Sequence, residues 1–432
     1  MNTRFHTRRQ FLRTSILGGA MAWTVPVFLE RTFCALDAMA ADSLVQTATG
    51  KDNTILVVLQ LAGGNDGLNT LIPYSDDAYY RVRPKIAIPA TSVHRLNDYC
   101  GLNPNLTGLK ALYDEGHLSV IQGVGYPNPN RSHFRSTEIW QTAVDSNKTD
   151  TNGWLGRYFD SCCQGEDPAV GISIGNQAPQ AFAAKVPRGI SFARPEEFRF
   201  DLRQTSKPQA ANAFFRSAND VETMDGSSIG MLQGPNSSGG DTLDFLHRTA
   251  LDATLSSDKI MELVKKSKAA SPYPANRLGD SLNLVGRLIA GGMSTRVYYV
   301  AHGGFDTHSN QLPTHERLMK ELDSSLSAFA ADLKAQGNFD RVLIMTFSEF
   351  GRRVAQNNSN GTDHGAAAPM FIAGGAIKAG VHGAAPSLTN LHDGDLIHTV
   401  DFRSVYATVL ENWLHAPVEP ILKRKFTTLP FV

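Results

Sequence analysis

The chain has 432 residues, of which 42% are hydrophobic and 19% are charged, so it can bury a large core in one or two domains. Its 41 basic and 41 acidic residues cancel, and no basic stripe stands out, so we expect no nucleic-acid partner. Four cysteines without a Cys-x-x-Cys spacing argue against a zinc ribbon or a disulfide scaffold. One disulfide, from Cys100 to Cys162 or Cys163, stays open as an alternative outside the cytoplasm.

The N-terminal segment has the features of an export signal. Arg8-Arg9 is followed by Phe-Leu, as in a twin-arginine signal, and an apolar stretch at 16–29 precedes the small-residue triplet at 38–40. We therefore predict a signal over residues 1–40, a flexible linker over 41–53, and an exported, periplasmic protein carried by the twin-arginine translocation machinery. The alternative is an uncleaved membrane anchor.

Five continuous apolar runs predict buried strands, because a central parallel strand is covered on both faces. They are residues 54–62, 118–124, 296–301, 341–347 and 369–375. Helical patterns alternate with them, at residues 105–116, 312–337 and 400–414. This alternation predicts one α/β domain over residues 54–432, with a mainly parallel sheet sandwiched by helices. The weakly periodic region at about 160–290 is interpreted as a long insertion or cap, with helical character over 242–291.

Polar, glycine-rich clusters follow the predicted strands. Because ligands bind outside the carboxyl ends of the strands in an open parallel sheet, we expect these clusters to meet at one edge. Their candidate functional residues, in chain order, are Asp66, Arg131, Ser132, His133, Asp306, His308, Glu349, Arg352 and, before the fifth strand, His364.

The residue types at this edge indicate a metal site. Carboxylates and imidazoles without thiolates suit Zn, Mn or Fe, and we predict one or two divalent ions held by Asp66, Asp306, His308, Glu349 and His364. Arg131 and Arg352 are predicted to bind an anionic phosphate or sulfate group. Each residue also has a structural alternative; Asp66, for example, is typical of an Asx turn.

Ser132 and His133 are predicted to be catalytic. Ser132 opens an apparent helix, where backbone N–H groups and the helix dipole favour an anion, so its hydroxyl is placed to act as a nucleophile. The alternative is that Ser132 only caps the helix and that a metal-bound water attacks instead.

Five ordered motifs carry a family resemblance: "LAGGNDGLNTLIPY", "RSHFRSTEIWQTA", "GGFDTHSNQ", "TFSEFGRR" and "GTDHGAAAPMFIAGG". With the twin-arginine start, they resemble the exported bacterial family known as domain of unknown function 1501, over nearly the whole mature chain. That family is placed in the alkaline phosphatase and sulfatase superfamily. The resemblance implies an α/β fold, a divalent-metal site at the strand ends, and cleavage of phosphate or sulfate esters.

The resemblance also implies roles for single residues. Asp66 resembles the first-strand metal aspartate, Ser132 the nucleophile, and Asp306 with His308 the Asp/His pair of one metal. His364 resembles the late metal histidine, and Glu349 takes the place of an aspartate in the superfamily's Ser-Asp-His-Gly pattern. Phe350 stands where that pattern has its histidine, and His133 or His302 is a candidate substitute.

These observations predict an exported, metal-dependent hydrolase acting on a small anionic phosphate or sulfate ester. No Cys-x-Pro-x-Arg sequence occurs, which argues against formylglycine chemistry. The alternative is a non-catalytic envelope protein that keeps the fold as a binding scaffold with a degenerate site, for which Phe350 is the main support.

Overall fold

The computed structural model describes residues 54–163, 168–186, 189–195 and 259–432. The predicted signal and linker, and most of the predicted insertion, lie outside these residues. Apart from residues 192–195 and 259–262, the described residues belong to one compact unit. No helix among them is long and apolar enough to cross a membrane.

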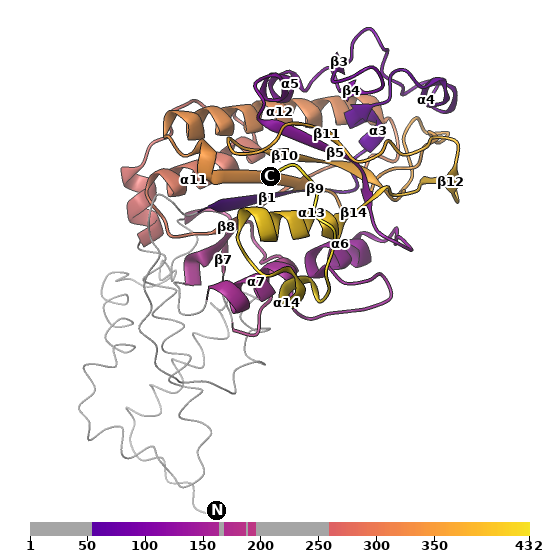
Figure 1. Cartoon of the computed structure of the whole chain (residues 1–432). Helices are drawn as coiled ribbons and strands as arrows, with labels where there is room; N and C mark the ends of the chain where they lie inside the picture. Colours follow the sequence, from indigo (N-terminus) through magenta and orange to yellow (C-terminus); the bar gives the residue numbers. More distant parts are fainter. Residues whose placement is uncertain (1–53, 164–167, 187–188, 196–258) are drawn as a thin grey trace, which may run out of the picture. The chain divides into compact units, whose positions relative to one another are not determined.

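A nine-stranded sheet is the centre of this unit (Figure 1). Along the sheet the strands are β11 (Gly380–His382), β5 (Leu118–Gly125), β10 (Ala368–Ala373), β9 (Val342–Phe347), β1 (Ile55–Ala62), β8 (Val297–Gly303), β6 (Gly171–Ile174) and β7 (Ile190–Phe192), with β14 (Val400–Asp401) also paired to β5. All five predicted strands are present. Seven of the eight residues of β1 are buried, as expected of a strand covered on both faces.

The strand of the fifth apolar run, β10, is antiparallel to its neighbours. β1 is parallel to β8 and β9, and β6 is parallel to β8, but β10 is antiparallel to both β5 and β9. The start of β10 therefore lies at the same edge as the ends of β1, β5, β8 and β9. For this reason the loop before β10, and not the loop after it, reaches the edge where we expect the site.

Helices cover both faces of the sheet (Figure 1). One layer contains α5 (Thr107–Asp114), α11 (Arg277–Ala290) and α12 (Gln311–Ala335), and the other contains α6 (His133–Thr142), α7 (Trp154–Cys162), α13 (Phe402–Thr408) and α14 (Val418–Leu422). The fold is thus the predicted α/β sandwich with a mainly parallel sheet. The predicted helix at 400–414 divides into α13 and a π-helical turn at Val409–Trp413.

The two layers are held by apolar side chains at the expected spacings. Leu318, Leu322 and Phe329 of α12 are each at most 1% exposed, and the helix ends just before Gly337, whose φ is +70°. On the other face, the rings of Trp140 and Phe402 stack with centroids 4.3 Å apart. This second core also includes alternate residues of β1, β8, β9 and β10.

Part of the predicted insertion belongs to the sheet domain. β6 and β7 extend the sheet beyond β8, and α11 packs against α12 and β8, although all three fall within about 160–290. β6 and β7 are short, and a run of three or four residues carries too little periodicity to be recognised. Residues 242–258 of the predicted helical stretch lie outside the described residues.

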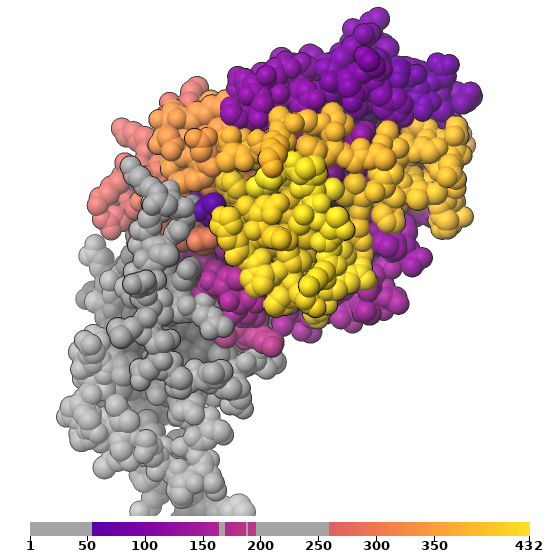
Figure 2. Space-filling model, viewed as in Figure 1, coloured from indigo at the N-terminus to yellow at the C-terminus, as the bar shows by residue number. Residues whose placement is uncertain are grey.

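Small elements complete the unit. They are α3 (Gly67–Thr70), α4 (Asp77–Val82), a three-stranded sheet of β2 (Leu71–Ile72), β4 (Gly101–Leu102) and β3 (His94–Arg95), and the hairpin of β12 (Leu391–His392) and β13 (Asp395–Leu396). The C-terminal segment, in yellow in Figure 2, packs between the orange and magenta segments. Phe431 is fully buried, and its carbonyl oxygen accepts a hydrogen bond from Lys378 N. No disulfide joins the three described cysteines.

Candidate metal centre

The loops that follow β1 and β8 approach each other closely. Gly63, directly after β1, has a φ of +118°, and a Cβ atom on it would lie 2.5 Å from the backbone nitrogen of Asp306. Only glycine adopts this conformation without strain and leaves room for the neighbouring backbone. The glycine therefore allows the Asp306 loop to lie against the end of β1.

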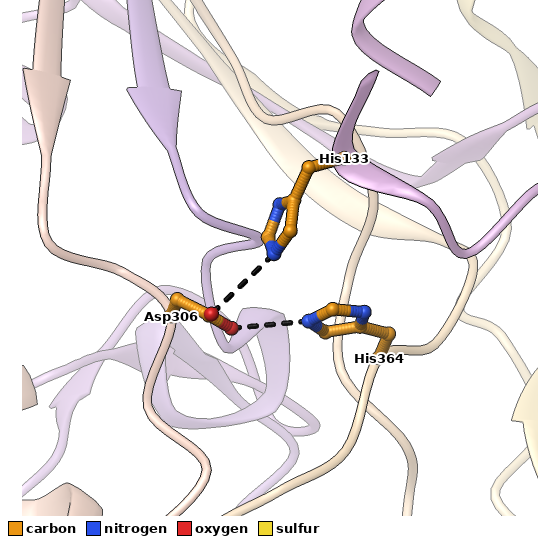
Figure 3. A group of neighbouring side chains, drawn as sticks. All are labelled: His133, Asp306 and His364. Carbon is orange, nitrogen blue, oxygen red and sulfur yellow. Dashed lines mark hydrogen bonds and ion pairs between the residues drawn. The ribbon is translucent and has the colours of Figure 1, made fainter. Parts of the chain in front are cut away.

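Three histidines converge on the carboxylate of Asp306. Nε2 of His364 and Nε2 of His308 lie 3.0 and 3.1 Å from Oδ1. Nε2 of His133 lies 3.4 Å from Oδ2, and Figure 3 shows the rings of His133, at the start of α6, and of His364, in the loop before β10, pointing toward the carboxylate. The Nε2 atoms of His308 and His364 are 2.9 Å apart. His133, Asp306 and His364 thus offer ligand atoms that all lie within 4.8 Å of one another, and His308 adjoins Asp306 and His364.

Each of these histidines has an acceptor behind it. Nδ1 of His133 is 2.8 Å from Glu349 Oε1, and Nδ1 of His364 is 2.8 Å from the carbonyl oxygen of Arg131. Nδ1 of His308 is 3.4 Å from Asp363 Oδ1. In neutral imidazole one nitrogen donates and the other carries a lone pair. Acceptors at all three Nδ1 atoms therefore assign the proton to Nδ1 and leave the Nε2 lone pairs directed at Asp306.

This arrangement favours a cation. Lone pairs of imidazoles and an ionised carboxylate repel one another at about 3 Å, whereas a metal ion between them attracts all four. Nε2 of His133 is buried and has no hydrogen-bond partner among the described residues. Histidine ligands whose other nitrogen donates to a carboxylate or carbonyl oxygen are the usual pattern at metal sites.

Asp306 is ionised at any physiological pH. Its partial burial would raise the pKa, but the hydrogen bond and the positive charge of Arg352 outweigh this and lower the pKa to about 2. Nη2 of Arg352 donates to Asp306 Oδ1 across 2.7 Å. About half of the Asp306 side chain is exposed, so the carboxylate is fixed by the protein and still open to solvent.

Glu349, predicted as a metal ligand, lies behind His133. The residue is 2% exposed, and Oε1 accepts from His133 Nδ1 and, at 2.8 Å, from Gly63 N. Oε2 is buried without a hydrogen-bond partner among the described residues. Glu349 therefore contacts the candidate ligand His133 and orients its imidazole ring. Phe350 packs its ring against His133 and His364, with centroids 4.9 and 4.5 Å away, and forms an apolar wall.

Asp66 is not brought into this group. It is the N-cap of α3, and Oδ2 forms an ion pair with Arg83 Nη1 at 2.6 Å, with both side chains fully buried. Gln311 also donates to Oδ2. Burial would raise the pKa of Asp66, but the charge and hydrogen bond of Arg83 lower it below its ordinary value. The buried guanidinium thus supplies the positive charge that the sequence-based prediction assigned to a metal ion.

Arg352 differs from its predicted anion-binding role. Its side chain is fully buried, and Nε, Nη1 and Nη2 donate to the carbonyl oxygens of Gly64, Thr362 and Phe305 at 2.6 to 2.9 Å. Because every guanidinium nitrogen already donates to the protein, this arginine holds the loops around Asp306 together.

Arg131 and Ser132 lie at the rim of the group. Arg131 is 37% exposed and donates from Nε and Nη2 to Asp395 Oδ2 at 2.8 and 2.5 Å. Ser132 is exposed at the N-cap position of α6, but its side chain makes no capping hydrogen bond. The capping alternative for the Ser132 hydroxyl therefore has no support in the geometry.

Sequence reasoning missed three of the residues that surround the site: Arg83, Gln311 and Asp395. Arg83 and Asp395 lie outside the glycine-rich clusters that follow the predicted strands. Gln311 ends the motif "GGFDTHSNQ", but an amide is neither a typical metal ligand nor a titratable group, so its chemistry did not single it out. His302, the other candidate substitute for the missing histidine, lies 3.6 Å from Glu321 of α12 and outside the group. His133 is the substitute that the structure places beside Asp306.

The fold and the convergent side chains define an α/β protein with a candidate metal centre at the edge where the parallel strands end. A family model described as "Protein of unknown function (DUF1501)" matches residues 120–414, and the chain belongs to this family. The family predicted from the motifs is thereby confirmed. No curated protein matches the sequence.

Several solved structures are similar to the chain at low identity. One is a protein in the alkaline phosphatase superfamily from Vibrio parahaemolyticus, with 9% identity and a TM-score of 0.37, covering 94% of this chain and 81% of that one. Another is the C-terminal periplasmic domain of EcEptC from Escherichia coli in a complex with Zn, with 10% identity and a TM-score of 0.35, covering 77% of this chain and 76% of that one. A third is the phosphonate monoester hydrolase SpPMH from Silicibacter pomeroyi, with 9% identity and a TM-score of 0.35, covering 85% of this chain and 74% of that one.

Proposed function

We propose that this protein binds one divalent metal ion through His133, Asp306, His308 and His364 and hydrolyses a phosphate or sulfate ester beside it. The observation that carries the proposal is the convergence of three imidazole Nε2 atoms on one ionised carboxylate, each imidazole being held from behind through Nδ1.

The spacing of these atoms supports a metal ion. Ligands at 2.0–2.1 Å from a tetrahedral zinc ion are about 3.3 Å apart. Nε2 of His133 lies 3.4 Å from Oδ2 of Asp306, and Nε2 of His364 and His308 lie 3.0 and 3.1 Å from Oδ1. The ligand atoms of His133, Asp306 and His364 all lie within 4.8 Å of one another, and His308 completes the proposed set from beside Asp306 and His364. Three imidazoles and one carboxylate suit Zn, Mn or Fe. We propose a single ion because Asp66 is neutralised by Arg83.

Ser132 and Arg131 supply the remaining chemistry in this proposal. A bound divalent ion acts as a Lewis acid that stabilises negative charge developing on the ester. Ser132 precedes the ligand His133, and its exposed hydroxyl stands at the N-terminus of the ten-residue helix α6, where backbone N–H groups favour an anion. The hydroxyl is thus placed to attack the ester, and the half-exposed Arg131 is placed to bind its anionic oxygens.

The site is proposed to act outside the cytoplasm. The Arg8-Arg9 signal supports export through the twin-arginine translocation machinery, and a small anionic ester is the substrate class that the site supports. Purified protein with a cleaved N-terminus near residue 40, recovered from the periplasm, is the expected result. Cytoplasmic retention of a chain with an intact Arg8-Arg9 pair would contradict this part of the proposal.

The first test is the metal content of the purified protein by elemental mass spectrometry. We expect about one equivalent of Zn, Mn or Fe in the wild type and in Ser132→Ala, and less than about a tenth in an Asp306→Ala/His308→Ala double variant. Unchanged metal content in the double variant would refute the site. Hydrolysis of nitrophenyl phosphate, bis-nitrophenyl phosphate and nitrophenyl sulfate then identifies the ester class.

The same assays separate hydrolysis by Ser132 from its alternatives. If Ser132→Ala loses activity but keeps its metal, the hydroxyl is the nucleophile; if activity persists and Asp306→Ala abolishes it, a water attacks instead. A second candidate function, a non-catalytic metal-binding scaffold, is favoured by the apolar wall that Phe350 forms against His133 and His364. A protein that holds one equivalent of metal and hydrolyses none of the three esters would support that scaffold.

A further inference from the structure

Gln311, the first residue of α12, joins the two loops that carry three of the four candidate ligands. The residue is fully buried, and its Oε1 accepts hydrogen bonds from Thr307 Oγ1 at 3.1 Å and from Thr362 Oγ1 at 2.6 Å. Thr307 directly follows Asp306, and Thr362 lies two residues before His364. One carbonyl oxygen therefore bridges the loop after β8 and the loop before β10.

The orientation of the Gln311 amide is determined by Asp66. Gln311 Nε2 donates to Asp66 Oδ2, and a carboxylate that is ionised beside Arg83 can only accept. The amide nitrogen must therefore face Asp66, and the amide oxygen must face the two threonines. Burial opposes ionisation of Asp66, but Arg83 keeps its pKa below the ordinary value. The charge of Asp66 therefore determines the direction of each hydrogen bond from Asp66 through Gln311 to the two threonines.

Backbone contacts also join the loops, so the fold does not depend on the Gln311 side chain alone. Thr362 N donates to Thr307 O at 3.3 Å, and Gln311 N donates to Asn360 O at 2.9 Å. Gly361 packs so tightly that a Cβ atom on it would lie 2.2 Å from the carbonyl carbon of His308. Loss of the side-chain bridge is expected to shift the loops by tenths of an ångström without unfolding the domain. A metal site is sensitive to displacements of that size.

We infer that Gln311 is a positioning residue for metal binding, which holds the Asp306–His308 loop and the His364 loop at ligand distance, with Asp66 as its anchor. The inference rests on the proposed metal site. It assigns Asp66, Thr307 and Thr362 a role in aligning the ligands from outside the group. It also accounts for an ionised aspartate that lies near a metal site and contacts no ligand of it.

The test compares Gln311→Leu with Gln122→Leu. Gln122 is a matched control because it is also buried, and its amide bonds to Gly383 O and Cys100 Sγ instead of to a ligand loop. For the wild type and both variants, the dissociation constants of Zn²⁺ and Co²⁺ are measured by competition with a chelator. The Co²⁺ absorption spectrum reports the coordination geometry, and the melting temperature of the metal-free protein reports stability.

Gln311→Leu is expected to raise both dissociation constants by about 10- to 100-fold and to alter the Co²⁺ spectrum, since removal of outer partners of metal ligands has effects of this size. Gln122→Leu is expected to bind both ions like the wild type, even with a similar fall in melting temperature. Binding by Gln311→Leu within twofold of the wild type, with an unchanged spectrum, would overturn the inference and leave the metal site standing. A wild type that binds neither ion would overturn both.

A second pair of variants covers the case in which Gln311→Leu does not fold. Thr307→Val/Thr362→Val removes both donors to the Gln311 oxygen without a change in side-chain size. Thr295→Val is its control, because Thr295 is equally buried but donates to Ala169 O, far along the chain from the ligand loops. The expected and the contradicting results are the same as for the first pair.

Discussion

Glu349 offers the sharpest test of the candidate site, because one substitution should act in opposite directions on metal binding and on stability. Its Oε1 lies 2.8 Å from both His133 Nδ1 and Gly63 N, while Oε2 is buried without a partner among the described residues. Glu349→Gln keeps the size and removes the charge. A carboxylate behind an imidazole makes it a stronger ligand, so we expect the metal dissociation constant to rise about 10- to 100-fold, or about 1.4 to 2.7 kcal/mol.

The metal-free protein should respond differently. A carboxylate that is 2% exposed, with one oxygen unpartnered, is costly to bury as a charge, and glutamine removes that cost. The free energy of unfolding of the metal-free variant is therefore expected to stay within about 1 kcal/mol of the wild type, or to increase. Urea unfolding after chelator treatment measures the free energy of unfolding of the metal-free protein, and competition with a chelator measures the metal affinity.

Glu115→Gln is the control, since Glu115 is half exposed and pairs with Lys334 at the surface. An exposed ion pair contributes about 0–1 kcal/mol, and no change in metal affinity is expected. The reasoning about Glu349 would be refuted if Glu349→Gln bound the metal as tightly as the wild type. A loss of more than about 3 kcal/mol in the metal-free protein would instead show that the carboxylate is mainly structural.

Four other outcomes are expected. Arg83→Met should lower the free energy of unfolding by about 3–5 kcal/mol in urea, because it leaves Asp66 as an unpaired buried charge; a loss below about 1 kcal/mol would contradict the buried pair. Burial lowers the pKa of His315 from 6.5 to about 4. Between pH 6.5 and pH 4 the imidazole therefore takes up a proton only in the unfolded chain, and the free energy of unfolding should fall by about 3 kcal/mol over that range. His315→Gln should flatten that slope in urea titrations, and an unchanged slope would count against the assignment. Gly63→Ala should cost roughly 1–3 kcal/mol and reduce metal content, since its Cβ meets the Asp306 backbone, and a silent variant would contradict the close approach. Metal at 1,000 times its dissociation constant stabilises the folded wild type by about 4 kcal/mol, so removal of the metal with a chelator should lower its melting temperature. The melting temperature of Asp306→Ala should not change on addition of chelator.

The fold was largely predictable from local patterns. β1, β5, β8, β9 and β10 lie within one or two residues of the five apolar runs, because a strand covered on both faces favours apolar side chains along most of its length. The boundaries of α12 followed from its helical stripe and the glycine after it. β6 and β7 were missed because three or four residues carry no usable period.

The candidate site was predictable in its chemistry and only in part in its membership. Asp306, His308 and His364 were predicted as ligands, and the structure brings them together. His133 was predicted as catalytic and lies at ligand distance instead. Whether these residues bind a metal stays a prediction. Glu349 and Asp66 carry the same charge as Asp306, but each has other partners, and no local pattern reveals which acceptor a carboxylate will have.

By itself, the sequence determined the five long strands, several of the helices, the family, and the collection of imidazoles and carboxylates at the strand ends, because periodicity and residue chemistry are local properties. Only the tertiary structure decided which side chains meet. The antiparallel direction of β10 places His364 at the site edge, and the fully buried Arg83 takes Asp66 out of it. Both depend on packing between segments far apart in the chain or on competition among many charged groups for the same partners. These are free-energy balances of the whole fold, which no single stretch of sequence contains.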